Sequence, residues 1–189
     1  MKIIAFTGPG GAGKNTAAQQ LGTQYHTAEV AFATPLYEMA AIALGITPEE
    51  VNQLKQQGDK AVRALLEQLG DVVRKTIRPD YLVVRMVDAL RELEESQDTP
   101  ELAVITDLRT EDEAYWVRAM KGLVIHVSRP EGTSDSQHST NQPITFAQGD
   151  QYLLNSGTVE DAGKIACAIV RSWIIAQQLA RQPEHQGAA

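Results

Sequence analysis

The residues with the most evident chemistry lie near the N-terminus, where a glycine-rich turn and a lysine follow a short apolar run. The segment Gly8-Pro9-Gly10-Gly11-Ala12-Gly13-Lys14-Asn15-Thr16 matches the pattern G-x-x-x-x-G-K, which cradles phosphates when it joins a strand to a helix. Glycines let backbone N–H groups converge on phosphate oxygens, and the N-terminus of the following helix adds partial positive charge. The segment therefore predicts a phosphate-binding loop (P-loop) for ATP, made by Gly8, Gly10, Gly11, Ala12, Gly13, Lys14, Asn15 and Thr16, with Lys14 at the β- and γ-phosphates.

An amide stands at the position of this loop where a hydroxyl usually ligates Mg²⁺. The oxygen of Asn15 can replace that hydroxyl, directly or through a water molecule. Thr16 carries a hydroxyl one residue later, but one residue turns an α-helix by about 100°, so a simple exchange of ligands does not follow. We expect ATP and Mg²⁺ as cofactors, with Asn15 as the candidate metal ligand and the part of Thr16 left open.

Two arginines mark a candidate site for a second anion. Arg63 and Arg74 are eleven residues apart, about three turns of an α-helix, so both face one side of the helix expected over 60–76. Gly70 lies near the same direction and leaves a bare patch between them. Arginine forks match phosphate oxygens, so the pattern suits a small anionic ligand on this helix. Two solvated arginines on an exposed face would give the same pattern, and this helix alone does not decide between the two interpretations.

A carboxylate and an arginine follow the third expected strand, at the edge where α/β sheets bind ligands. Asp107 is placed to orient Mg²⁺-bound water or the attacking group, and Arg109 to hold a phosphate. The polar stretch after Val127 is long for a loop and indicates a segment that closes over the nucleotide, with Arg129 as its catalytic arginine. His138 in that stretch is more simply a solvated loop residue.

Composition restricts the class of protein. The chain has 189 residues, 43% apolar and 22% charged, with a net charge of −7; this fits one globular domain and disfavours binding of nucleic acid or anionic membranes. Cys167 is the only cysteine, which excludes an internal disulfide framework, and its apolar neighbours predict a core position. The first apolar run is too short for a signal peptide and no run approaches a membrane span, so we expect a cytoplasmic protein.

Strand and helix patterns alternate, which predicts a three-layer α/β fold of the P-loop NTPase type, a mostly parallel sheet with helices on both faces and a lid segment. We expect one kinase domain over 1–181, with an acceptor-binding helical region at about 34–98 and a lid at about 129–151, followed by a flexible tail at 182–189. The expected strands are 3–6, 29–33, 102–106, 123–127 and 152–154; the expected helices begin near 14, 35, 48, 60, 80, 111 and 159. Thr47–Glu50 and Thr110–Glu113 have the spacing of capping boxes, and Asp80 is expected to cap a helix that reaches about residue 95.

Several segments, taken in order, resemble the bacteriophage deoxynucleoside monophosphate kinase family. The P-loop is generic to many kinases, whereas the ordered set of later segments is more specific. The resemblance spans most of the chain and rests on the P-loop, Ala33–Leu36, Leu65–Gly70, Asp107–Arg109, Val124–Pro130 and Asn155–Asp161.

The resemblance implies a role for each matched residue. Lys14 would bind donor phosphates, Arg129 would belong to the lid, and Asn155 and Gly157 would lie beside the adenine of ATP. The chain departs from the family at Asn15, where aspartate or serine is usual, and at His138-Ser139-Thr140-Asn141, where the family has a glutamate. A base-recognition insertion found in some members is short here, so no base preference is carried over. The acceptor would be surrounded by Thr34, Pro35, Leu36, Arg63, Gly70, Arg74 and Arg109.

Together these features favour a kinase that transfers the γ-phosphoryl group of ATP to a (deoxy)nucleoside monophosphate. One alternative is a P-loop kinase for another small phosphorylated acceptor, such as dephospho-coenzyme A. The other is a nucleotide-dependent switch, although the guanine-binding pattern Asn-Lys-x-Asp is absent from the sequence. We expect small nucleotides as partners, no nucleic acid or membrane, and a homodimer as the default for a soluble enzyme.

Overall fold

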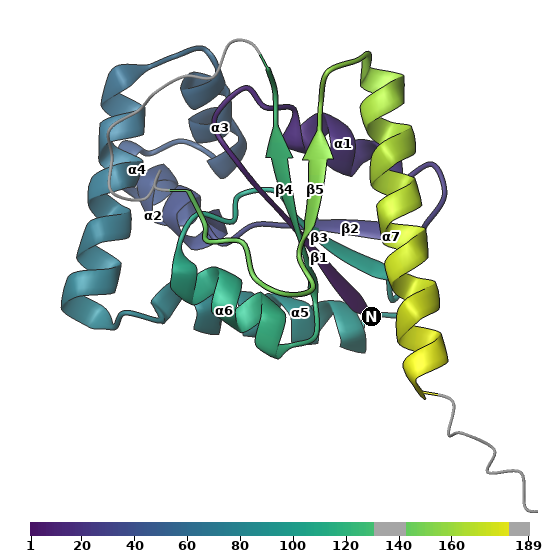
Figure 1. The fold of residues 1–189 in the computed structure, drawn as a ribbon. Coiled ribbons are helices and arrows are strands. Elements are labelled where there is room, and N and C mark those ends of the chain that lie inside the picture. The colour runs from purple at the N-terminus through teal and green to yellow at the C-terminus, as the bar shows by residue number, and fades with distance from the viewer. Residues whose placement is uncertain (131–142, 182–189) are drawn as a thin grey trace, which may run out of the picture.

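Five short strands form one parallel sheet, and its central strands are apolar. The structure, a computed structural model, describes residues 1–130 and 143–181 (Figure 1). The strand order is β2-β3-β1-β4-β5 and every neighbouring pair is parallel, so β1 lies at the centre between β3 and β4. This confirms the predicted α/β fold. The strands are β1 (Lys2–Thr7), β2 (Thr27–Val30), β3 (Leu102–Ile105), β4 (Leu123–Ser128) and β5 (Gln151–Leu154).

Helices cover both faces of the sheet, because successive side chains of the central strands are buried on opposite sides. In β1, Ile3 and Ala5 belong to one apolar cluster, and Ile4 and Phe6 belong to the other. The first cluster includes α5 (Tyr81–Glu95) and α6 (Glu111–Ala119); the second includes α1 (Lys14–Leu21) and α7 (Val159–Arg181), which pack along each other. Cys167 is buried in the second cluster, as predicted. No helix within residues 1–130 and 143–181 is both long and apolar enough to cross a membrane.

Three helices and a π-helical turn lie beside the sheet (Figure 1). Glu50 N–H donates to Thr47 Oγ1 at 3.2 Å and Thr47 N–H donates to Glu50 Oε2 at 2.8 Å, so the predicted capping box is formed. Gly45 takes the left-handed conformation with φ of 68° and ends the helix before it. The elements are α2 (Thr34–Leu44), α3 (Pro48–Gln56), α4 (Lys60–Val72) and the π-helix η1 (Val73–Ile77).

Three local predictions differ from the structure. Strand β2 lies nearer the N-terminus than the expected 29–33, because the next backbone N–H groups bond to Asp107 and lead into α2. The helix expected over 60–76 is α-helical only as far as α4, after which its hydrogen bonds widen into η1. Asp80 does not cap α5 through its side chain; its carboxylate is bound by Arg78 at 2.6 and 2.9 Å instead.

The segment expected to form a lid is only partly described. Residues 131–142, which include His138, and the tail at 182–189 lie outside the described residues. Residues 143–150 pack on the body of the domain: Arg118 donates to Asp150 at 2.7 Å and to the Thr145 carbonyl at 2.8 Å. His126 Nε2 also lies 2.9 Å from Asp150. This part of the predicted lid is therefore anchored to β4 and α6.

Candidate active site

The P-loop follows β1 at the carboxyl end of the sheet, as the sequence predicts. Gly8 has φ of 135°, and a Cβ there would lie only 2.1 Å from the carbonyl oxygen of Val127 in β4. No other residue type fits that approach. Gly11 and Gly13 also have positive φ values, 79° and 94°. The glycines thus let the loop turn tightly over the sheet and bring it to the N-terminus of α1.

Lys14 is bound to its own loop. Its ammonium donates hydrogen bonds to the carbonyl oxygens of Gly8 at 2.7 Å and Pro9 at 2.8 Å. Burial and the charge of Arg109 lower the pKa of Lys14 from 10.5 to about 8, and the charge of Asp107 opposes the decrease. Phosphate oxygens that accept these hydrogen bonds in place of the two carbonyl oxygens would stabilise the charged form of Lys14.

Asn155, the residue directly after β5, binds the backbone of the P-loop. Its side-chain N–H₂ donates to the carbonyl oxygen of Ala12 at 2.9 Å, and the residue is only 7% exposed. A Cβ on Gly13 would lie 2.3 Å from the Asn155 amide nitrogen, so the loop rests directly on this side chain. The contact of Asn155 with adenine stays a prediction. Gly157 lies in the turn before α7, where Thr158 and Asp161 form mutual hydrogen bonds.

Asp107 follows β3, next to the P-loop strand, and holds the start of the helical region. Its two carboxylate oxygens accept the backbone N–H groups of Phe32 at 3.0 Å and Ala33 at 2.9 Å. Burial raises the pKa of Asp107, and these two hydrogen bonds and the charges of Arg109 and Lys55 oppose the increase. Each oxygen accepts only one of these bonds and keeps a lone pair for another partner. Asp107 therefore fixes the turn before α2 and can still accept a water or a ligand.

Glu113 is the buried carboxylate that organises the arginines. Oε1 accepts from Arg74 Nη2 at 3.2 Å, and Oε2 accepts the backbone N–H groups of Arg109 at 2.9 Å and Thr110 at 3.1 Å. Burial raises the pKa of Glu113, and the neighbouring charge of Asp107 adds to the increase. The predicted capping box of α6 thus has a second use, because it fixes the backbone from which Arg109 projects.

The expected anion patch between Arg63 and Arg74 is arranged differently. Arg74 turns to Glu113, 39 positions later in the chain. A Cβ on Gly70 would meet Arg74 Nη1 at 3.0 Å and Leu36 Cδ1 at 3.4 Å, so Gly70 makes room for the arginine and is not a bare surface. The reason is the widened turn at η1, which changes the direction that the arithmetic of a continuous α-helix assigns to Arg74.

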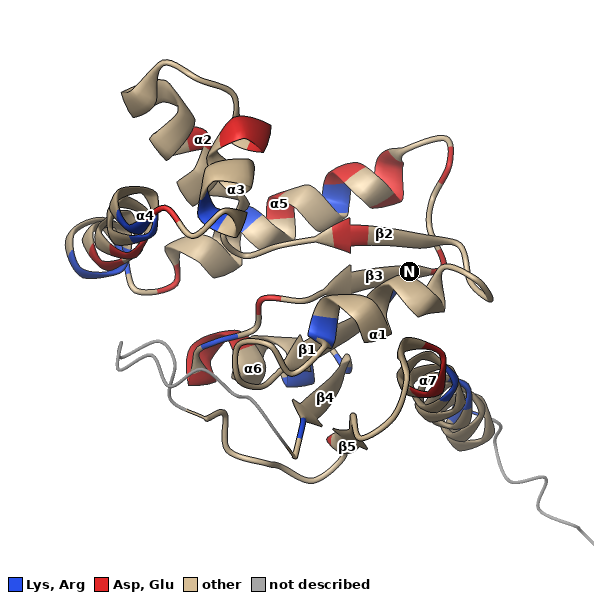
Figure 2. Cartoon of the chain, turned by 90° about the horizontal axis from the view of Figure 1, so that it is seen from above, with Lys and Arg blue, Asp and Glu red and all other residues tan. Residues whose placement is uncertain are grey.

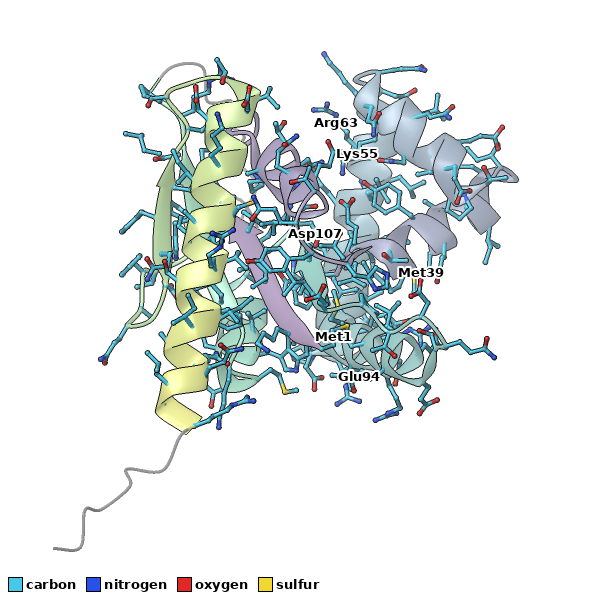
Figure 3. All side chains as sticks on the ribbon, turned by 90° about the vertical axis from the view of Figure 1, so that its right-hand side faces the viewer. Met1, Met39, Lys55, Arg63, Glu94 and Asp107 are labelled. Carbon is cyan, nitrogen blue, oxygen red and sulfur yellow. The ribbon has the colours of Figure 1, made fainter. Side chains whose placement is uncertain are left out.

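Lys55 is a basic residue of this region that the sequence reasoning missed. It lies in the last turn of α3, its ammonium donates to the hydroxyl of Tyr37, and its nitrogen lies 5.1 Å from the centre of that ring. Arg63 Nη2 donates to the backbone carbonyl of Lys55 at 3.3 Å. Figure 3 shows Lys55 and Arg63 directed from α3 and α4 toward the part of the molecule that carries Asp107. A single lysine in the last turn of a helix gives no sequence signal of such a position.

The remaining predicted residues differ in accessibility. Thr34, Asn15 and Arg129 are exposed, whereas Pro35 and Leu36 are buried, and Leu36 belongs to the core cluster. Figure 2, seen from above the strands of Figure 1, shows basic positions on α1, α3 and α4 at this end of the molecule. Within the described residues, no three His, Cys, Asp or Glu side chains form a metal-binding group.

Comparison with known proteins decides the family. A model of the deoxynucleotide monophosphate kinase family matches residues 45–165. This chain belongs to that family. The match covers well over half of the chain and begins after the P-loop, so it rests on the helical region, Asp107–Arg109 and the segment up to the first turns of α7. The family assignment and the P-loop geometry are therefore separate observations.

Individual relatives are similar at modest identity. The deoxynucleotide monophosphate kinase of Enterobacteria phage T4 is 28% identical over 121 residues, which cover 64% of this chain and 48% of that protein; the chain thus spans about half the length of this relative. A protein of Acanthamoeba polyphaga mimivirus named "Putative deoxynucleotide monophosphate kinase" is 25% identical over 182 residues, 85% of this chain and 92% of that protein. The crystal structure of shikimate kinase from Aquifex aeolicus aligns with 90% of this chain and 96% of that chain, with 12% identity and a TM-score of 0.42.

Proposed function

We propose that this chain is a nucleotide kinase that transfers the γ-phosphoryl group of ATP to a deoxynucleoside monophosphate. The observation that carries the proposal is the convergence of Lys14, Asp107 and Arg109, whose charges act on one another at the carboxyl ends of β1 and β3. One P-loop lysine accounts for a bound nucleotide. A second cation beside a carboxylate, on the neighbouring strand, supports a second anionic substrate placed next to the first. Family membership points to the deoxynucleotide acceptor.

In this mechanism the protein positions and neutralises its substrates. An oxygen of the acceptor phosphate attacks the γ-phosphorus of ATP, the bond from that phosphorus to the β-phosphate oxygen breaks, and ADP and a deoxynucleoside diphosphate are released. The attacking oxygen needs no general base, because the second pKa of a phosphate monoester is about 6. Lys14 would balance the charge on the transferred group, and Arg109 the charge of the acceptor. Arg129, which follows β4, is proposed to approach the same group from the lid side.

The residues present are compatible with an Mg²⁺ ion bound together with ATP. Mg²⁺ usually takes one or two protein oxygens and completes its shell with phosphates and water. Asp107 has free lone pairs beside Lys14, and the exposed side chain of Asn15 offers an amide oxygen at the start of α1. When bound, the ion would neutralise charge on the β- and γ-phosphates.

Small nucleotides are the proposed partners, and a homodimer in the cytoplasm stays a prediction. The net charge of −7 with several basic residues near the P-loop supports small anionic ligands more than long polyanions. ADP formation from ATP with a panel of nucleoside and deoxynucleoside monophosphates, and with dephospho-coenzyme A, tests the proposal. Turnover that depends on a deoxynucleoside monophosphate supports it. Turnover only with dephospho-coenzyme A, or slow hydrolysis indifferent to every acceptor, would replace it with one of the two alternatives.

A further inference from the structure

The helical side of the site contains a cation with unused hydrogen-bonding capacity. The ammonium of Lys55 can donate three hydrogen bonds. Among the described residues its one side-chain hydrogen bond is to the Tyr37 hydroxyl, and the side chain is only partly exposed. The charge of Lys55 acts on the carboxylate of Asp107. An anion placed between them and the P-loop would therefore find a charged donor on the helical side.

Arg74, which the sequence pattern suggests as a ligand for the second anion, already forms an ion pair within the protein. Arg74 is 24% exposed and is paired with Glu113, whose side chain is 4% exposed. Moving Arg74 to a ligand would leave a buried carboxylate without its cation, which is strongly unfavourable. Within the described part of the chain, Lys55 is not paired with a buried carboxylate. Its hydrogen bond is to a neutral tyrosine hydroxyl, which a phosphate oxygen can replace at little cost. Arg63 also helps to fix Lys55, since its guanidinium bonds the backbone carbonyl of that residue.

The geometry points to Lys55 as a residue that binds the phosphate of the acceptor nucleotide, with Tyr37 holding its ammonium ready in the absence of substrate. This inference rests on the proposed function. Lys14 and Lys55 would then approach the two phosphate groups from different elements, one from α1 and the other from α3. Arg74 would act through Glu113 and the backbone of Arg109, without touching the acceptor.

The test is the steady-state kinetics of Lys55→Met, which keeps the length of the side chain and removes its charge. We expect the KM for the deoxynucleoside monophosphate to rise about 10- to 100-fold, the range for a lost hydrogen bond to a charged group. The KM for ATP should change less than twofold. Lys55→Arg should restore most of the acceptor affinity. Lys164→Met removes an exposed lysine of α7 that pairs with Glu160 and serves as the matched control; it should leave both KM values unchanged.

Inhibition by a deoxynucleoside without a phosphate separates the phosphate from the base and sugar. Lys55→Met should leave its inhibition constant unchanged; a loss equal to that for the monophosphate would overturn the assignment to phosphate. Unfolding temperatures of Lys55→Met and wild type within about 3 °C exclude a folding defect, and where they differ more, Lys55→Gln is measured in its place. If Lys14→Ala abolishes turnover while Lys55→Met and Lys55→Gln leave the acceptor KM unchanged, the Lys55 inference alone is wrong.

If the wild type phosphorylates no nucleotide, the proposed function itself fails, and Lys55 is tested by binding alone. Calorimetric titration with deoxynucleoside 5′-monophosphates then decides. Weaker binding to Lys55→Met than to wild type and Lys164→Met supports the inference, whereas equal binding, or no binding to the wild type, overturns it.

Discussion

We predict that the lowered pKa of Lys14 makes ATP binding depend on pH in a range where ordinary lysines do not titrate. Burial and Arg109 lower the pKa of Lys14 to about 8 in the free protein. A polyphosphate binds the charged form, so binding takes up a proton wherever Lys14 is neutral beforehand. Above pH 8 each further unit should weaken ATP binding about tenfold. Between pH 7 and pH 9 the charged fraction falls from about 0.9 to about 0.1, which predicts a loss of about tenfold in affinity.

Calorimetric titration with ATP without added Mg²⁺, from pH 7 to pH 9, measures this effect. Titrations at pH 9 in two buffers with different ionisation enthalpies should show uptake of nearly one proton per ATP bound. Lys14→Arg provides the control, because a guanidinium stays charged throughout this range. The affinity of this variant for ATP should not change between pH 7 and pH 9. A lysine with the ordinary pKa of 10.5 would lose only a few per cent of its charge between these pH values. A change in affinity below about twofold for the wild type would therefore refute the reasoning.

Three further substitutions test the architecture of the site. Gly8→Ala places a Cβ 2.1 Å from a backbone oxygen at φ of 135° and should lower the free energy of unfolding by about 3 kcal/mol, seen as a drop of about 6–12 °C in Tm. Gly58→Ala, at φ of 89° with nothing nearby, should cost about 1 kcal/mol; equal effects would show that the contact with β4 is unimportant. Asn155→Ala removes the support of Ala12 and should raise the KM for ATP about 5- to 10-fold while the acceptor KM stays constant, an expectation that a larger change for the acceptor would contradict. Glu113→Ala leaves Arg74 without its carboxylate and should lower the free energy of unfolding in urea by about 2–4 kcal/mol, whereas Glu160→Ala, at an exposed pair, should leave the midpoint unchanged; similar midpoints for the two variants would disprove the importance of the buried pair.

The fold could be predicted because its signals are local. Apolar runs predicted β1, β3 and β4 closely, whereas β2 lies nearer the N-terminus than the expected 29–33. Capping boxes predicted the starts of α3 and α6, since a capping box needs only residues within three positions of one another. Asp80 shows the limit of such signals. Its type and position favour a cap for α5, but Arg78, two residues away, binds the same carboxylate. When two local partners compete for one group, the sequence does not state which interaction is stronger.

The site was predictable where one segment makes it and less so where distant segments meet. The P-loop needs only its own residues and the strand before it. Arg74 depends on Glu113, and Asp107 on backbone groups 74 and 75 positions earlier. Such pairings follow from the order of the strands and from a π-helical turn. The spacing of residues in the sequence predicts neither of them. The role of Lys55 depends on the same packing, because only the contact of α2 with α3 sets it beside Tyr37.

The central claim is that Lys14 assists the transfer of a phosphoryl group from ATP to a deoxynucleoside monophosphate. Incubation with ATP labelled at the γ-phosphate and one deoxynucleoside monophosphate at a time, followed by separation of the products, measures this directly. We predict label in a deoxynucleoside diphosphate for at least one acceptor, and a loss of at least about a hundredfold in Lys14→Ala with no change in unfolding temperature. Label that appears only as inorganic phosphate, or near-normal transfer by Lys14→Ala, would contradict the account.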